Sequence, residues 1–152
     1  MSITLCISRI ACIGFLVLGF ALQSQANSYA VIINTTNNYS LNDIAQAKKD
    51  IRLYYLKNQK QWPSGKKVKP YGFLSTDTAQ IAFNQHVLEM SASQLTQHWL
   101  NKKQTTGESP PKALKSDRAA IMLVSKREGA FGIIKHNQAN PLPNTVKMLF
   151  KF

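Results

Sequence analysis

Residues 57–73, KNQKQWPSGKKVKPYGF, combine five lysines, a tryptophan and a Pro-Ser-Gly turn in a short space. The stretch has two interpretations: a basic patch that binds a polyanion, or a connection between a helix and a strand. Residues 63–65 are a typical turn sequence. Residues 68–73 can form a strand, in which Pro70 favours an edge position or a bulge. We therefore interpret the stretch as a helix-to-strand connection whose lysines lie at the helix end and in the turn.

The segment before this connection contains a strand and a helix. Residues 29–33, YAVII, are rich in β-branched side chains and predict a buried strand. Ser40 and Asp43 have the spacing of a capping box, with Asp in place of the usual Glu. A helix is therefore expected to begin at Leu41 and to reach Leu56.

Cap residues predict three more helices after the connection. The first has four consecutive possible N-caps, which are Ser75, Thr76, Asp77 and Thr78. Ser91 and Gln94 form another capping box, and the helix that follows carries Trp99 on its apolar face. Ser116 is the expected N-cap of the last helix, which Gly129 closes.

Two further strands complete the predicted elements. Residues 130–135 form an apolar run, and residues 146–152 alternate in a way that places Val146, Met148 and Phe150 on one face. Residues 102–112, KKQTTGESPPK, are expected to be a loop. Strands interleaved with helices indicate an α/β fold, here a compact single domain.

The first 26 residues have the features of a secretory signal peptide. Residues 10–22 are an uncharged and almost wholly apolar run of 13 residues, and Ser-Gln-Ala at 24–26 is typical of a cleavage site. The alternative is a retained anchor, but a membrane-spanning helix needs roughly 20 residues. We predict a periplasmic protein, cleaved near Ala26, whose mature domain spans residues 27–152. Both cysteines lie in the leader, so the mature domain would have no disulfide and no thiolate chemistry.

The protein is strongly basic, with a formal net charge of +12. Cleavage would remove one cation, Arg9, and leave 18 Lys and Arg against 7 Asp and Glu. Such a charge favours nucleic acid in a cytosolic protein, but predicted export argues against a nucleic-acid partner. Two interpretations stay open: a surface for envelope polyanions or small anions, and a solvated lysine-rich surface. Few of the cations are arginine, the residue best suited to bidentate phosphate recognition.

The search for catalytic chemistry gives no positive result. His86, His98 and His136 lack the spacing of metal ligands, and the sequence has no nucleophile elbow, P-loop or dinucleotide fingerprint. We therefore expect no enzyme activity, no metal and no cofactor. Trp62 and Trp99 could stack on a ligand, although aromatic side chains in a small domain are usually part of the core.

Two loops rich in hydroxyl side chains are the candidate binding sites. Thr35 and Thr36 form one, and the other contains the four possible caps at residues 75–78. The free N–H groups and positive dipole at a helix N-terminus suit an oxyanion. The alternative for both loops is ordinary helix capping.

The order of segments resembles the solute-binding proteins of phosphate transporters, and especially their short members. The similar segments are LNDIAQAKKDIRLYYLKNQKQW (41–62), AFNQHVLEMSASQLTQHW (82–99), TTGESPPKAL (105–114) and REGAFGIIK (127–135). The resemblance implies part of a periplasmic-binding-protein type II fold, with a ligand held at helix N-termini between lobes. It covers residues 29–135, nearly the whole predicted mature chain.

The sequence departs from this family in length and in the phosphate motif. The chain is about half as long as a two-lobed member, and the family's Arg…Ser-Gly-Thr motif is replaced by FLSTDT (73–78), without arginine or glycine. The resemblance leaves Ser75, Thr76 and Thr78 as hydroxyl donors, with Asp77 as a repulsive carboxylate. Thr106 and Gly107 match the Thr-Gly of the short members.

These observations predict an exported, non-catalytic solute-binding-like protein whose partner is phosphate or another small oxyanion. The alternative is an envelope interaction module that has lost its ligand and binds a protein, such as a transporter, or a membrane surface. The candidate ligand-binding residues are Thr35, Thr36, Ser75, Thr76, Asp77, Thr78, Thr106 and Gly107.

Overall fold

The structure, a computed structural model, describes residues 29–139 and 141–152, so the predicted leader at residues 1–26 lies outside the described residues. Five strands form one sheet in the order β3-β2-β4-β1-β5. Their bounds are Tyr29–Asn34 for β1, Lys69–Phe73 for β2, Lys112–Leu114 for β3, Ala130–Lys135 for β4 and Val146–Lys151 for β5. The α/β class predicted from the sequence is therefore confirmed.

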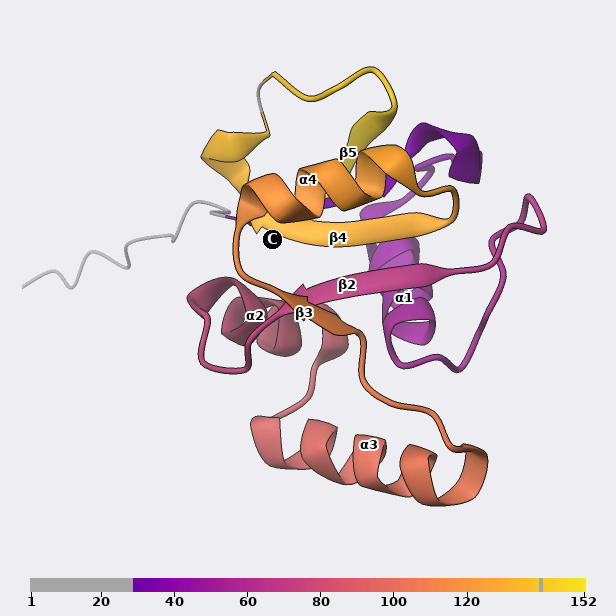
Figure 1. Ribbon diagram of the computed structural model, residues 1–152, viewed down its shortest axis with the longest axis vertical. Helices are drawn as coiled ribbons and strands as arrows, with labels where there is room; N and C mark the ends of the chain where they lie inside the picture. The colour runs from indigo at the N-terminus through magenta and orange to yellow at the C-terminus, as the bar shows by residue number, and fades with distance from the viewer. Residues whose placement is uncertain (1–28, 140) are drawn as a thin grey trace, which may run out of the picture.

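Helices cover both faces of the sheet (Figure 1). A Cβ at Gly132 of β4 would meet Ala120 and Val124, so helix α4 (Asp117–Lys126) covers one face. A Cβ at Gly72 would meet Tyr55 and Gln80, so helices α1 (Ile44–Tyr55) and α2 (Thr78–Phe83) cover the other. The core between these layers is apolar and cysteine-free.

Helix α3 (Ala92–Thr106) lies apart from the two layers, at one end of the molecule (Figure 1). Trp99 is the buried residue of α3. The ring of His98 makes a 3.1 Å hydrogen bond with the carbonyl of Leu56, at the end of α1. Trp99, the hydrogen bond of His98 and a 3.2 Å hydrogen bond from Lys102 Nζ to the carbonyl of Lys57 together join α3 to the rest of the domain. The burial of Trp99 agrees with its predicted apolar position.

Strand directions decide which loops share an end of the sheet. Strands β3, β2 and β4 are parallel, whereas β1 is antiparallel to both of its neighbours, β4 and β5. The loop after β1 therefore lies at the opposite end of the sheet from the loop after β2.

Cap residues and apolar patterns in the sequence predicted most helices and strands correctly. The predicted first residue of α1 was wrong. The helix begins at Ile44 rather than Leu41, because Asp43 is itself the N-cap and accepts the N–H groups of Ala45 and Gln46. The capping box of Ser91 and Gln94 and the cap by Ser116 are both confirmed.

Strand β2 lies between β3 and β4 rather than at an edge of the sheet, which corrects the edge position that Pro70 favoured. The proline pairs with Phe131 of β4, while pairing with β3 begins only at Tyr71. Pro70 is tolerated because it lies at the start of the strand, where β2 has a neighbour on one side only.

The segment 102–112, expected to be a loop, contains more structure than predicted. Helix α3 continues to Thr106 and ends at Gly107, whose φ of +70° is the left-handed geometry of a helix C-cap. Lys112 then begins β3, the short edge strand. Three residues are too few to show a sequence period, so only pairing with β2 reveals this strand.

The last strand departs from its simple alternation. Val31 pairs with Phe150 and Ile32 with Met148, so Leu149 is an extra residue in a β-bulge. Leu149 is consequently buried, while Met148 is 38 % exposed. In the described residues, no helix combines the length and the apolar character needed to cross a membrane.

Candidate functional site

The loop at residues 74–78 follows the carboxyl end of β2 and leads directly into α2. Asp77 is the N-cap of this helix, and its carboxylate accepts the N–H of Ala79 at 2.8 Å. The helix thus begins with one of its free N–H groups already bound by a negative charge. An oxyanion that approached the same helix end would meet the Asp77 carboxylate.

The hydroxyl groups of this loop face solvent. Ser75, Thr76 and Thr78 are exposed, and Asp77 is half-buried. The Thr78 hydroxyl oxygen accepts a 3.0 Å hydrogen bond from the Tyr29 hydroxyl. This leaves the hydrogen of Thr78 free to be donated to a ligand.

A buried polar network fixes the loop to the body of the domain. The Gln80 side chain accepts the N–H of Phe73 and donates to the Asn84 side chain, both at 2.8 Å. A Cβ at Gly72 would lie 2.5 Å from the Tyr55 hydroxyl and 2.6 Å from the Gln80 carbonyl oxygen, so only glycine allows this approach. Burial raises the pKa of Tyr55 to about 12, and the hydrogen bond with Gln80 opposes that rise. The network is neutral and positions the loop rather than binding a ligand.

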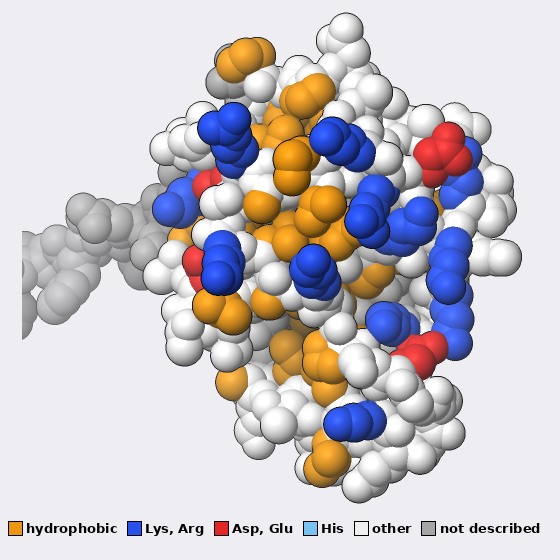
Figure 2. All heavy atoms as spheres, viewed as in Figure 1, with side chains coloured by type: hydrophobic (Ala, Val, Ile, Leu, Met, Phe, Trp, Pro, Cys, Tyr) orange, Lys and Arg blue, Asp and Glu red, His pale blue; other side chains and the backbone are white. Residues whose placement is uncertain are grey.

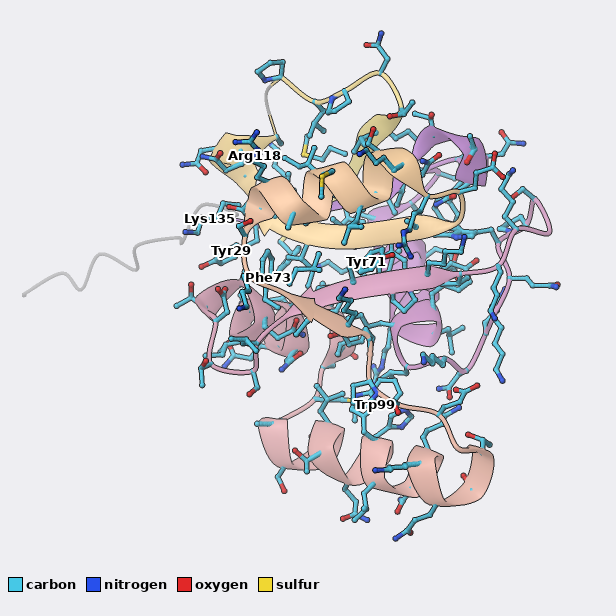
Figure 3. All side chains as sticks on the ribbon, in the orientation of Figure 1. Tyr29, Tyr71, Phe73, Trp99, Arg118 and Lys135 are labelled. Carbon is cyan, nitrogen blue, oxygen red and sulfur yellow. The ribbon has the colours of Figure 1, made fainter. Side chains whose placement is uncertain are left out.

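A groove of about 420 Å³ lies between this loop and α3. Its walls are mostly apolar and include Phe73, Ser75, Trp99 and Pro110. Figure 3 shows Trp99 projecting from α3 towards the body of the domain. The hydroxyl loop is therefore the polar rim of an apolar groove.

Thr35 and Thr36 lie at the opposite end of the sheet, after β1. The N–H and hydroxyl of Thr36 both donate to the Asn34 side chain, at 2.9 and 2.6 Å. Asn34 also donates to the carbonyl of Val124 at 2.7 Å. This loop forms a local cap that ties β1 to α4.

Thr106 and Gly107 lie at a third place, the C-terminal end of α3. The Thr106 hydroxyl donates to the carbonyl of Lys102 at 2.9 Å, and the Gly107 N–H donates to that of Lys103. A helix C-terminus carries the negative end of the dipole and does not attract an anion. The candidate residues are thus in three separate places, and residues 75–78 form the group at the start of an α-helix.

The structure also forms a basic groove that sequence reasoning missed, which we call the lysine groove. It has a volume of about 480 Å³ and lies at the amino ends of β2 and β3. Its cationic lining comes from three segments and consists of Lys57, Lys60, Lys67 and Lys112. The lysine density of residues 57–67 was a partial signal, but nothing local showed that Lys112 would join them.

Glu108 is the acidic residue of the lysine groove. Lys60 forms an ion pair with it, at 2.5 Å between Nζ and Oε1. The hydrogen bond from Lys60, together with the charges of Lys57 and Lys102, holds the pKa of this carboxyl below its usual range. Figure 2 shows Lys and Arg side chains gathered on the side where Figure 1 places the turn after α1 and the loop after α3.

The described residues contain no group of three His, Cys, Asp or Glu side chains that could hold a metal ion. Trp62, considered as a stacking residue, is 2 % exposed and donates its indole N–H to the carbonyl of Gly129 at 2.9 Å. Its ring packs against Tyr54 and Phe131. Trp62 is therefore part of the core.

The sequence matches no known family profile and no curated protein. The fold is similar to the crystal structure of an ABC-type phosphate transport receptor from Vibrio cholerae, with a TM-score of 0.54 and 13 % sequence identity. The similarity covers 80 % of this chain but 45 % of the receptor, so the chain spans less than half of the receptor's length. It shows that the domain has the fold of part of this receptor.

Proposed function

We propose that this protein is an exported, non-catalytic binding protein of the solute-binding type, and that it takes a small oxyanion such as phosphate at residues 75–78. One observation carries the proposal: an exposed hydroxyl loop lies at the carboxyl end of the central parallel strand and opens a helix. Open α/β sheets bind their ligands at the carboxyl ends of strands. The similarity in fold to a phosphate transport receptor supports the same ligand class.

The chemistry of the loop limits the affinity. Each neutral hydroxyl contributes roughly 0.5–1.5 kcal/mol through a hydrogen bond, and a charged acceptor raises this value. The loop has no arginine, and the Asp77 carboxylate repels an anion. We expect phosphate to bind no more tightly than roughly micromolar, which corresponds to about −8 kcal/mol.

Calorimetric titration of the purified protein with phosphate tests the proposal. Wild-type protein should bind in the micromolar to millimolar range, and Thr78→Ala should bind more weakly because the ligand loses one donor. Thr36→Ala is the matched control, since Thr36 lies at the opposite end of the sheet and should leave binding unchanged. A protein that takes up no phosphate at millimolar concentration would not support an oxyanion site at this loop.

The second candidate is an envelope interaction module that has lost its ligand. Two observations favour it: Asp77 already caps the helix end, and the loop contains no arginine. Absence of phosphate binding in both the wild type and Asp77→Asn would make this the better account. The module would then use its basic surface on a partner.

Export rests on residues 1–26, outside the described residues. In cells that express the whole chain, the periplasmic fraction should contain a form that begins near Asn27. N-terminal sequencing checks this, and intact Met1 in a membrane fraction would contradict it.

A further inference from the structure

We propose that the lysine groove binds an acidic segment of a partner protein, in which Glu or Asp side chains stand beside apolar ones. The inference goes beyond the proposed oxyanion site, because the two sites lie at opposite ends of β2. It rests on the charge of the groove and on its apolar walls.

The groove contains more lysines than the contacts within the domain occupy. Lys57 donates to the carbonyl of Ser109 at 2.8 Å, and Lys60 pairs with Glu108. Lys57 also follows the C-terminal end of α1, where a positive charge offsets the negative end of the helix dipole. Lys67 and Lys112 lie on the approach to β2 and at the start of β3, and no described carboxylate lies within 4.0 Å of either ammonium group. These two cations are available to a ligand.

Lys57 has a left-handed backbone, with φ at +55°. The N–H groups of Lys57 and Asn58 bond the carbonyls of Tyr54 and Leu53, the pattern of a Schellman motif in which glycine is usual. A side chain at this position costs the fold stability. The Lys57 side chain lines the groove and donates to the carbonyl of Ser109 at 2.8 Å. Because glycine suits this backbone geometry better, Lys57→Gly removes the side chain without straining the fold.

The walls of the groove select the kind of anion. Beside the four lysines they include Tyr54, Val68, Pro70, Pro110 and Pro111. A free oligophosphate has no apolar surface to cover these side chains, whereas a peptide with glutamate and apolar residues has. Lysine also lacks the planar fork that favours phosphate.

Glu108 shows the kind of contact that the groove makes. Its Oε1 bonds Lys60, while its Oε2 is buried and has no hydrogen-bond partner among the described residues. The chain thus places one carboxylate of its own in the groove, and the lysines around it outnumber that charge. A partner's carboxylates would find Lys67 and Lys112 beside this pair.

A fluorescence-anisotropy titration tests the proposal with a short labelled peptide of alternating glutamate and leucine. The same peptide with glutamine in place of glutamate is the uncharged control. Wild-type protein should bind only the acidic peptide, and binding should weaken as salt rises. The double variant Lys67→Gln/Lys112→Gln should weaken binding at least about tenfold, because charge-assisted hydrogen bonds are the strong class.

The matched control removes the same charge elsewhere. Lys135→Gln/Lys151→Gln changes two exposed lysines at the carboxyl ends of β4 and β5, and should alter peptide affinity less than about twofold. Lys57→Gly should also weaken peptide binding, yet melt no lower than wild type, because glycine suits the left-handed position.

Four results would overturn the proposal. The first is equal binding of the acidic and the glutamine peptides, and the second is no binding of the acidic peptide at millimolar concentration. The third is an equal loss of affinity in the groove variant and the control variant. The fourth is displacement of the peptide by inorganic tripolyphosphate at far lower concentration than by unlabelled peptide, which would assign the groove to a phosphate ligand. Phosphate binding at residues 75–78 is measured separately, so either site can fail without the other.

Discussion

The hydroxyl loop and the lysine groove lie at opposite ends of β2, and each contains one carboxylate where an anion would bind. Asp77 caps the start of α2, accepts the N–H of Ala79 and forms no ion pair with any described residue. Glu108 is paired with Lys60 in a groove that contains three more lysines. In the first region the protein's own carboxylate competes with an incoming anion for the positive end of the α2 dipole. In the second, positive charge remains after the carboxylate is satisfied.

This difference shows that a site is defined by the balance of charge rather than by the presence of donors. Exposed hydroxyls and N–H groups are neutral donors, so one ionised carboxylate offsets much of their attraction for an anion. Ammonium groups carry full charges, and one carboxylate neutralises one of them. The comparison therefore predicts stronger, salt-dependent anion binding in the lysine groove than at the hydroxyl loop.

Trp99→Ala should have the largest effect, because both regions depend on the placement of α3. Trp99 lines the apolar groove beside the hydroxyl loop, and α3 leads directly into Glu108. Deletion of a large buried aromatic costs about 3–5 kcal/mol. For a domain of this size, that corresponds to a fall of roughly 10 °C or more in melting temperature.

Leu100→Ala is the control on the same helix. Leu100 is 49 % exposed, so its loss should change the unfolding free energy by no more than about 0.5 kcal/mol. If Trp99→Ala melted within a degree of wild type, Trp99 would not anchor α3, and its role as a ligand-stacking residue would be reopened.

Glu108→Gln tests the carboxylate of the lysine groove. Its side chain is 18 % exposed, but its partner Lys60 is 62 % exposed, so solvent screening limits the loss of unfolding free energy to about 0.5–1 kcal/mol at neutral pH. The same variant should bind the acidic peptide more tightly, because it removes a competing anion. Glu128→Gln is the control for peptide binding: that carboxylate pairs with Lys66 outside the lysine groove, so its removal should leave the affinity for the peptide unchanged.

The stabilisation by Glu108 should depend on pH in a defined direction. The pKa of this carboxyl is lowered in the folded protein from an ordinary value of 4.5, so its contribution is present above that pH. It is lost as the pH falls through the lowered pKa, because protonation removes the charge that Lys60 binds. Chemical denaturation of the wild type and Glu108→Gln from about pH 7 down into the acid range should show the difference shrink once the pH falls below about 4.5. A difference that persists at low pH would mean that packing, not charge, is responsible.

Asp77→Asn should have the smallest effect on stability and still change phosphate binding. Asparagine caps a helix about as well as aspartate, so the fold should be unaffected. Removal of one charge near the ligand contributes about 1 kcal/mol in water, or roughly fivefold tighter phosphate binding by titration. Asp43→Asn is the matched control, because Asp43 caps α1 in the same way and lies outside the hydroxyl loop. Equal changes in both variants would point to a general effect of net charge.

Local signals in the sequence determined the elements and the fold class. Three such signals are the β-branched run of β1, the capping box at Ser91 and the cap at Ser116. Each involves residues only a few positions apart, so the sequence alone predicts it. The apolar face of α3 likewise marked Trp99 as a buried residue. These features depend on interactions between near neighbours in the chain.

Tertiary structure decided the strand order and the gathering of the lysines. Pairing placed β2 inside the sheet, between β3 and β4, despite Pro70. It made a strand of residues 112–114 and put Leu149 into a bulge. It also brought Lys112 beside Lys57, Lys60 and Lys67, and separated Thr36 from the hydroxyl loop. Hydrogen bonds between strands that are distant in the sequence set the positions of these residues. No single segment contains both partners of such a bond. The sequence by itself thus determined which elements form, whereas long-range pairing decided which side chains meet.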